Sequence, residues 1–71
     1  MVYFNDIKLE NGIITAIAID SSTGITETIT ASMDGTYHSS SNRWIIQATW
    51  NLISDYERDG KLPTKRNVYW Y

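Results

Sequence analysis

The chain of 71 residues has no cysteine, one proline and one histidine. Without cysteine it cannot form a disulfide, a thiolate metal site or a thiol nucleophile. The lone histidine, His38, cannot build a metal site or a Ser-His-Asp triad without partners that the sequence does not specify. No apolar run is long enough to span a bilayer, and the N-terminus lacks a basic region followed by an apolar run. We therefore expect a cytoplasmic protein with no cofactor, no bound metal and no membrane partner.

The acidic residues are too dispersed to predict catalysis. A two-metal nuclease needs several converging carboxylates, whereas Asp20 and Asp34 fall in turns, where aspartate commonly bonds to the local backbone. Asp55 and Asp59 are one helical turn apart and either face one ligand or are simply solvated. The glycines fall at turns or at a helix end and form no phosphate-binding loop. We expect no enzymatic activity.

The net charge is small but unevenly distributed along the chain. A formal charge of -2 argues against a dedicated binder of duplex nucleic acid. All the acidic residues precede residue 61, and the last eleven residues hold three cations beside three aromatic residues. Such a segment binds single-stranded nucleic acid by stacking and phosphate contact, or it is a core-filling strand after a solvated loop. The candidate nucleic-acid residues are Lys61, Lys65, Arg66, Tyr69, Trp70 and Tyr71.

One long segment, Ser41 to Asp59, has helical periodicity. Ser40, Ser41 and Asn42 each offer a side-chain oxygen for the first turn. Gly60 is suited to the left-handed position after the last turn, and Leu62 is expected to fold back on the helix end. The expected core face consists of Trp44, Ile45, Ala48, Leu52 and Tyr56.

A second apolar stripe lies on one flank of this helix and is formed by Ile46, Trp50 and Ile53. A helix on a single sheet needs an apolar stripe only about 100° wide. Either the sheet curls around the helix, or these residues bind a second molecule, because aromatic anchors are enriched at interface centres.

Alternating and apolar patterns predict strands at residues 3–9, 13–20 and 25–32, and a short fourth strand at residues 67–71 beside the first. The expected fold is α+β: a three-stranded antiparallel meander, one long helix packed on one sheet face, and a short C-terminal fourth strand. If the fourth strand runs parallel to the first, the helix serves as a crossover. We expect residues 1–71 to form a single domain.

The turn at Asn11-Gly12 allows two strand registers. A two-residue turn pairs Glu10 with Ile13 and places Asp6 beside Ile17. A three-residue loop with Gly12 in the left-handed position pairs Leu9 with Ile13 instead. We favour the three-residue loop because it collects the larger apolar residues on the core face, namely Tyr3, Ile7, Leu9, Ile13, Ile17 and Ile19.

That register leaves the opposite sheet face flat, uncharged and weakly apolar. Its residues suit sheet-to-sheet self-association or a docked partner, although threonine is also an ordinary exposed strand residue. Glu27 falls on the inward side, either beyond the area that the helix covers or beside a bulge. The candidate interface residues on the outer face are Ala16, Ala18, Thr26, Thr28 and Thr30, beside Ile14.

The order strand-strand-strand-helix-strand, with Asp59-Gly60 and Leu62-Pro63 after the helix, resembles the HicB antitoxin group, which has a partial ribonuclease-H fold. The proline-leucine-proline-glycine type of loop common in that group is absent, and MDGTYHSSSN stands in its place. No site residue follows from this resemblance. In size, acidity and aromatic content the chain is also similar to the small inhibitors that phages and mobile elements direct against host defences.

These observations predict a small non-enzymatic protein-interaction module that forms a homodimer and works by binding another protein. The most specific role within that class is an inhibitor of a host or partner enzyme, of the phage anti-defence or antitoxin-like type. The alternative is a nucleic-acid-binding module that uses the basic and aromatic C-terminal segment.

Overall fold

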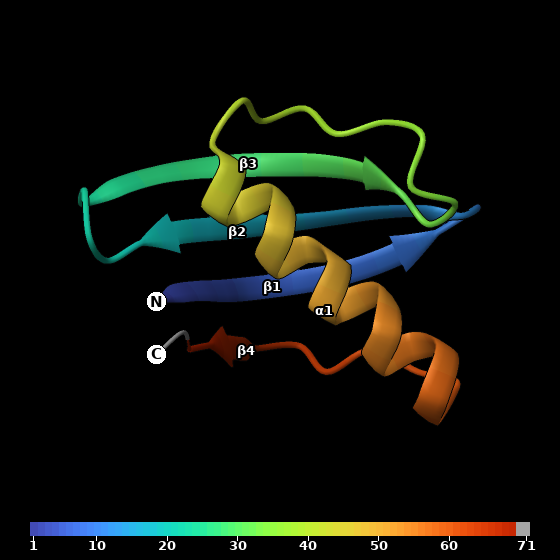
Figure 1. Cartoon of the computed structure of the whole chain (residues 1–71). Helices are drawn as coiled ribbons and strands as arrows, with labels where there is room; N and C mark the ends of the chain where they lie inside the picture. Colours follow the sequence, from blue (N-terminus) through green and yellow to red (C-terminus); the bar gives the residue numbers. More distant parts are fainter. Residues whose placement is uncertain (70–71) are drawn as a thin grey trace.

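The computed structural model describes residues 1–69, and in them it has four strands and one helix in the expected order (Figure 1). The strands form one antiparallel sheet in the order β3-β2-β1-β4, and the helix α1 crosses one face of it. The α+β class, the three-stranded meander and the short fourth strand are confirmed. The elements are β1 (Val2–Glu10), β2 (Ile13–Asp20), β3 (Ile25–Ser32), α1 (Arg43–Asp59) and β4 (Arg66–Val68).

The fourth strand runs antiparallel to β1, with Val68 opposite Val2. The helix is therefore not a crossover between parallel strands. Residues 70 and 71, which we expected to complete this strand, lie outside the described residues. Backbone pairing continues before β4, because the N–H of Ile7 donates to the carbonyl of Thr64 at 3.0 Å.

Both ends of α1 are defined by the residues that the sequence indicates. The side chain of Asn42 accepts hydrogen bonds from the backbone N–H groups of Trp44 and Ile45, so the helix begins two residues after Ser41. Gly60 ends it at a φ of 74°, a left-handed conformation that glycine adopts without a Cβ clash. Leu62 then packs against the core, as expected.

The strand register differs from the one we favoured. Asn11 and Gly12 both have positive φ, 52° and 77°, and they form a two-residue turn that pairs Glu10 with Ile13. The three-residue loop is wrong. The objection to the shorter turn was that Asp6 would lie beside Ile17. A bulge at Asp6, which has a φ of 53°, removes that objection because Asn5 now lies opposite Ile17.

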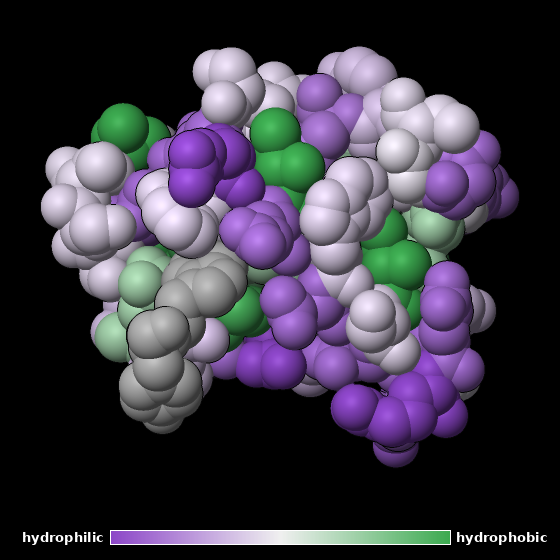
Figure 2. Space-filling view, in the orientation of Figure 1, coloured by the Kyte–Doolittle hydropathy of each residue, from purple (hydrophilic) through white to green (hydrophobic). Residues whose placement is uncertain are grey.

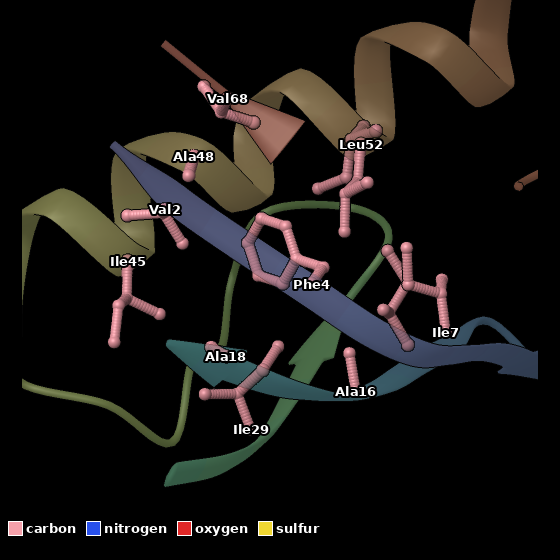
Figure 3. Close-up of a cluster of buried hydrophobic side chains, with 12 residues drawn as sticks. Val2, Phe4, Ile7, Ala16, Ala18, Ile29, Ile45, Ala48, Leu52 and Val68 are labelled. Atoms are coloured by element: carbon pink, nitrogen blue, oxygen red, sulfur yellow. The ribbon is translucent and has the colours of Figure 1, made fainter. Parts of the chain in front are cut away.

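A shift of one residue exchanges the two faces of the sheet. Ala16 is 3% exposed and Ala18 is fully buried, so their predicted place on the outer face is wrong. Small residues fit here because Phe4 of β1 and large side chains of α1 fill the space between helix and sheet. Figure 3 shows Phe4 on β1 and Leu52 on α1 among the buried side chains. The core cluster is Val2, Phe4, Ile7, Ile14, Ala16, Ala18, Ile29, Ile45, Ala48, Leu52, Ile53 and Val68.

The helix is also rotated relative to the expected orientation. Ile45, Ala48 and Leu52 are buried as predicted, but Trp44 is 38% exposed. Ile53, which we placed on the outer flank, is only 8% exposed and belongs to the core. The expected core face of α1 was therefore right at its centre and wrong at one margin.

The segment between β3 and α1 runs along the outer edge of β3 (Figure 1). The N–H of Ser39 donates to the carbonyl of Thr30 at 2.9 Å. His38 forms an isolated antiparallel β-bridge with Ala31. Glu27 is half-buried on the helix side, and the register between β2 and β3 contains no bulge. Glu27 lies opposite the buried Ala18, so the alternative of a bulge between β2 and β3 is wrong.

Candidate protein-interaction surface

The sheet face opposite α1 is the surface that stands out, and we call it the open face. Within residues 1–69, no helix or loop packs on it, since α1 packs on the other side and the loop after β3 follows the sheet edge. Strand pairing places side chains of all four strands on this face. Its members are Tyr3, Asn5, Lys8, Glu10, Ile13, Thr15, Ile17, Ile19, Thr26, Thr28, Thr30, Ser32 and Asn67.

The apolar part of the open face is centred on Tyr3, Ile17 and Ile19, and Thr15 separates this centre from Ile13. Tyr3 lies opposite Ile19, and Ile17 is the next residue of β2 on the same side. These three side chains are half-buried by their neighbours in the sheet, and Ile13 at the far end of β2 is 37% exposed. Cross-strand neighbours on β3 are threonines: Thr26 beside Ile19, and Thr28 beside Ile17. The threonines predicted for the outer face therefore do lie there, around an isoleucine and tyrosine centre.

The face is nearly free of charge. Among its paired positions in the described strands, the charged residues are Lys8 and Glu10, which have opposite signs and lie on the same strand. They line a shallow recess at the hairpin end, together with Asn11, Ile13 and Thr15. The net negative charge of the chain therefore lies elsewhere on the molecule.

The helix side has a different surface. In Figure 2 the strongly hydrophobic residues form separate small areas between hydrophilic ones. Trp50 is 37% exposed, but its ring lies against the turn at Gly35, where a Cβ would be 3.5 Å from a ring carbon. Of the predicted flank of Ile46, Trp50 and Ile53, only Ile53 is buried in the core, while Ile46 is half-buried and Trp50 stays partly exposed.

The basic C-terminal segment is also partly engaged. Arg66 Nε donates to Asp55 Oδ2 at 2.8 Å, and Arg66 donates a further hydrogen bond to the carbonyl of Asn67. The ion pair with Arg66 joins Asp55 of α1 to β4. Asp55 also accepts from Arg58, one turn further along α1, at 3.2 Å. Among the other predicted nucleic-acid residues, Lys61 and Lys65 are exposed and Tyr69 is 57% exposed, while Trp70 and Tyr71 lie outside the described residues.

Asp59 binds a neighbouring side chain as well. Its carboxylate accepts hydrogen bonds from Arg58, which lower the pKa of Asp59. Asp55 and Asp59 thus contact arginine side chains, and they do not converge on a ligand position. In the part of the chain that the structure describes, no group of three or more His, Cys, Asp or Glu side chains is placed to hold a metal ion.

His38 anchors the loop before α1. Its Nδ1 accepts from the N–H of Ser40 at 3.0 Å, and its Nε2 lies 2.9 Å from the hydroxyl of Thr49. Because that hydroxyl donates to the carbonyl of Ile45, the histidine Nε2–H is the donor to Thr49. Burial lowers the pKa of His38, and the nearby Glu27 partly opposes this effect. The ring therefore stays neutral near pH 7 and stabilises the loop.

A second polar contact connects the end of β2 to the start of the helix. Asp20 is 1% exposed, and its carboxylate accepts from the side chain of Asn42 at 3.0 Å. It also accepts from the N–H and hydroxyl of Ser22. The hydrogen bonds from Asn42 and then from Ser22 lower the pKa of Asp20 to about 2. This cluster stabilises the sheet–helix connection on the covered side.

Sequence reasoning did not place Tyr3, Ile13, Ile17 and Ile19 on a surface. The Asn-Gly pair was the available signal, because it favours the two-residue turn and hence the observed register. The compensating bulge at Asp6 has no glycine to mark it.

Comparison with protein families, with curated proteins and with solved structures found no match to this chain. The described part of the chain contains no helix that is long and apolar enough to cross a membrane. The open face is therefore interpreted from its own chemistry.

Proposed function

We propose that this chain is a small protein-interaction module that binds a protein through the open face and acts without catalysis. The observation that carries the proposal is the placement of the β2 side chains. Ile13, Ile17 and Ile19 lie on the uncovered side of the sheet, while alanines lie beneath the helix. Ile17 and Ile19 are neighbours on this side, next to Tyr3, and Thr15 separates them from Ile13. Adjacent apolar residues on an uncovered face are typical of an interaction site.

The energetic argument uses the part of these side chains that is still in contact with water. Fully burying an isoleucine contributes about 1.5–3 kcal/mol, so covering the exposed part of a half-buried one contributes about 1 kcal/mol. Tyr3 adds an aromatic side chain with a polar end, a type enriched at interface centres. A micromolar affinity corresponds to a binding free energy of about 8 kcal/mol. Three or four such residues supply a meaningful part of it.

An inhibitor or antitoxin-like role is the most specific form of this proposal. Such a role requires only that the chain cover a surface of its partner, and the open face offers a flat, uncharged patch for that purpose. The small size and the acidic balance of the chain support the same interpretation.

Site-specific photo-crosslinking tests the proposal. A benzophenone amino acid in place of Thr28 reports on the open face, and the same group in place of Gln47 reports on the exposed side of α1. We expect protein crosslinks in expressing cells from position 28, and loss of these products when Ile17→Lys is added. Equal crosslinking from both positions, or none from position 28, contradicts the proposal.

Single-stranded nucleic acid is the second candidate ligand. The exposure of Lys61, Lys65 and Tyr69 supports it, whereas the ion pair of Arg66 with Asp55 leaves one cation fewer for phosphate. Titration of tryptophan fluorescence with single-stranded DNA and RNA at low salt distinguishes the two. The protein-binding proposal expects no change, and a change that weakens steeply with salt favours the nucleic-acid alternative.

A further inference from the structure

We infer that the partner of the open face is a second copy of this chain, packed sheet against sheet around a two-fold axis. This inference rests on the proposed function and names its partner. Two stacked sheets bury their facing side chains in a layer about 10 Å thick. In such a dimer the helix of each copy lies on the outside, and the open faces become an inner layer.

The first argument is charge. The chain carries a formal charge of -2, so two copies repel each other weakly over most of their surface. Lys8 and Glu10 leave the open face with balanced charges in the described strands. A second copy therefore meets no repulsion there. No excess of one sign on this face selects a strongly charged foreign partner.

The second argument is area. The chain measures 30 × 22 × 19 Å along its principal axes, so a whole face offers about 600 Å² and a pair of faces about 1,200 Å², the lower end of specific interfaces. A two-fold dimer that uses the whole open face therefore reaches a sufficient size. A partner that covers only part of the face buries less area than specific interfaces usually need.

The third argument is the distribution of side-chain types. An isologous interface must be complementary to itself, because the same patch occurs on both sides. The centre of the open face consists of Tyr3, Ile17 and Ile19, and its margin on β3 consists of Thr26 and Thr28. Apolar centres then face each other within a margin of hydroxyl groups that remain partly hydrated.

Sedimentation equilibrium over a concentration series tests the inference. We expect the mass to rise from 8.2 kDa toward twice that value with increasing concentration. Thr28→Lys adds a charge to each face without removing an apolar side chain, and it should weaken dimerisation about tenfold or more. The matched control, Ser54→Lys, adds the same charge on the exposed side of α1 and should leave the dissociation constant unchanged.

Circular dichroism and thermal unfolding of both variants separate lost association from lost folding. A wild-type mass of 8.2 kDa at every concentration overturns the inference, and so does equal weakening by the two variants. If the wild type is monomeric but the probe at position 28 still crosslinks to another protein, the proposed function stands and the second copy is wrong. If neither is observed, both proposals fail.

Discussion

The two faces of the sheet carry apolar side chains of different size, and on β2 the larger ones are on the side without a helix. The covered face holds Ile14, Ala16 and Ala18, and the open face holds Ile13, Ile17 and Ile19. The alanines are buried because neighbouring elements contribute the volume: Phe4 from β1, and Ile45 and Leu52 from α1. The comparison shows that the face of a strand with the larger residues is not necessarily its core face.

Adjacent residues of β1 give the most direct energetic contrast between the faces. Phe4 is fully buried and Tyr3 is half-buried on the open face. Phe4→Ala should cost about 3–5 kcal/mol through lost burial and a cavity, a large part of the stability of so small a domain. Tyr3→Ala should cost about 1 kcal/mol or less, because it removes only cross-strand contacts. Urea unfolding of the monomer measures both values, and similar losses would contradict the assignment of the faces.

Changing the volume or shape of a side chain should cost more on the covered face than on the open face. Ala18→Leu adds volume beneath the helix and should cost about 2 kcal/mol through overpacking. Ile19→Leu changes the shape of an open-face residue and should cost less than about 1 kcal/mol. Thermal unfolding of the two variants compares them. An unchanged thermal stability of Ala18→Leu would show that Ala18 is not closely packed beneath the helix.

Asp20 makes the covered side sensitive to acid. Its pKa of about 2 in the folded chain lies below the ordinary value of 3.8. The stabilisation is therefore fully present above about pH 4 and is lost as the pH falls through about 2. Asp20→Ala should cost about 1.5 kcal/mol at neutral pH, because it removes the hydrogen bonds of a buried carboxylate.

The acid dependence is measured by urea unfolding between pH 2 and pH 7. Subtracting the curve of Asp20→Ala from that of the wild type removes the contribution of the other acidic groups, such as Asp34, whose pKa is lowered by the hydroxyl of Thr36. A difference between the two curves that does not decrease toward pH 2 would show that the Asp20 contacts do not depend on its charge.

The smallest effect is expected from deleting Asp6. This residue is the extra one of the bulge, so its removal leaves Phe4 and Ile7 on the covered side. We expect a change within about 1 kcal/mol, because relief of the left-handed conformation offsets the lost contacts. Deleting Thr15 from the regular ladder of β2 should instead exchange the faces of half that strand and unfold the chain. Comparable effects of the two deletions would argue against the bulge.

Much of the fold was predictable because its signals are local. Asn42 and Gly60 define the helix ends through side-chain and backbone rules that do not depend on the rest of the chain. The bounds of β1, β2 and β3, to within a residue, and the α+β class follow from periodicity. The faces were not predictable from periodicity alone, because both sides of β2 are apolar.

The candidate site was predicted on the wrong face of β2 because the strand register was chosen incorrectly. Choosing the register that collected the isoleucines reversed the assignment, and it brought Ala16 and Ala18 into the predicted interface in place of Ile17 and Ile19. Thr26, Thr28 and Thr30 were placed on the correct side because β3 does alternate between apolar and polar residues. The bulge at Asp6 arises from long-range pairing and has no composition signature.

Thiol labelling tests the central claim most directly, because the chain has no cysteine and each variant carries a single thiol. The variants are Ala16→Cys on the covered face, Ile17→Cys on the open face and Ser54→Cys on the exposed side of α1. We predict that the thiol at position 17 reacts rapidly in dilute protein and slowly in concentrated protein. Position 54 should react rapidly at all concentrations, and position 16 slowly at all concentrations.

Faster reaction at position 16 than at position 17 would show that the faces are reversed. A rate at position 17 that does not change with protein concentration, in a chain whose position 16 is protected, would contradict the packing of a second copy on the open face.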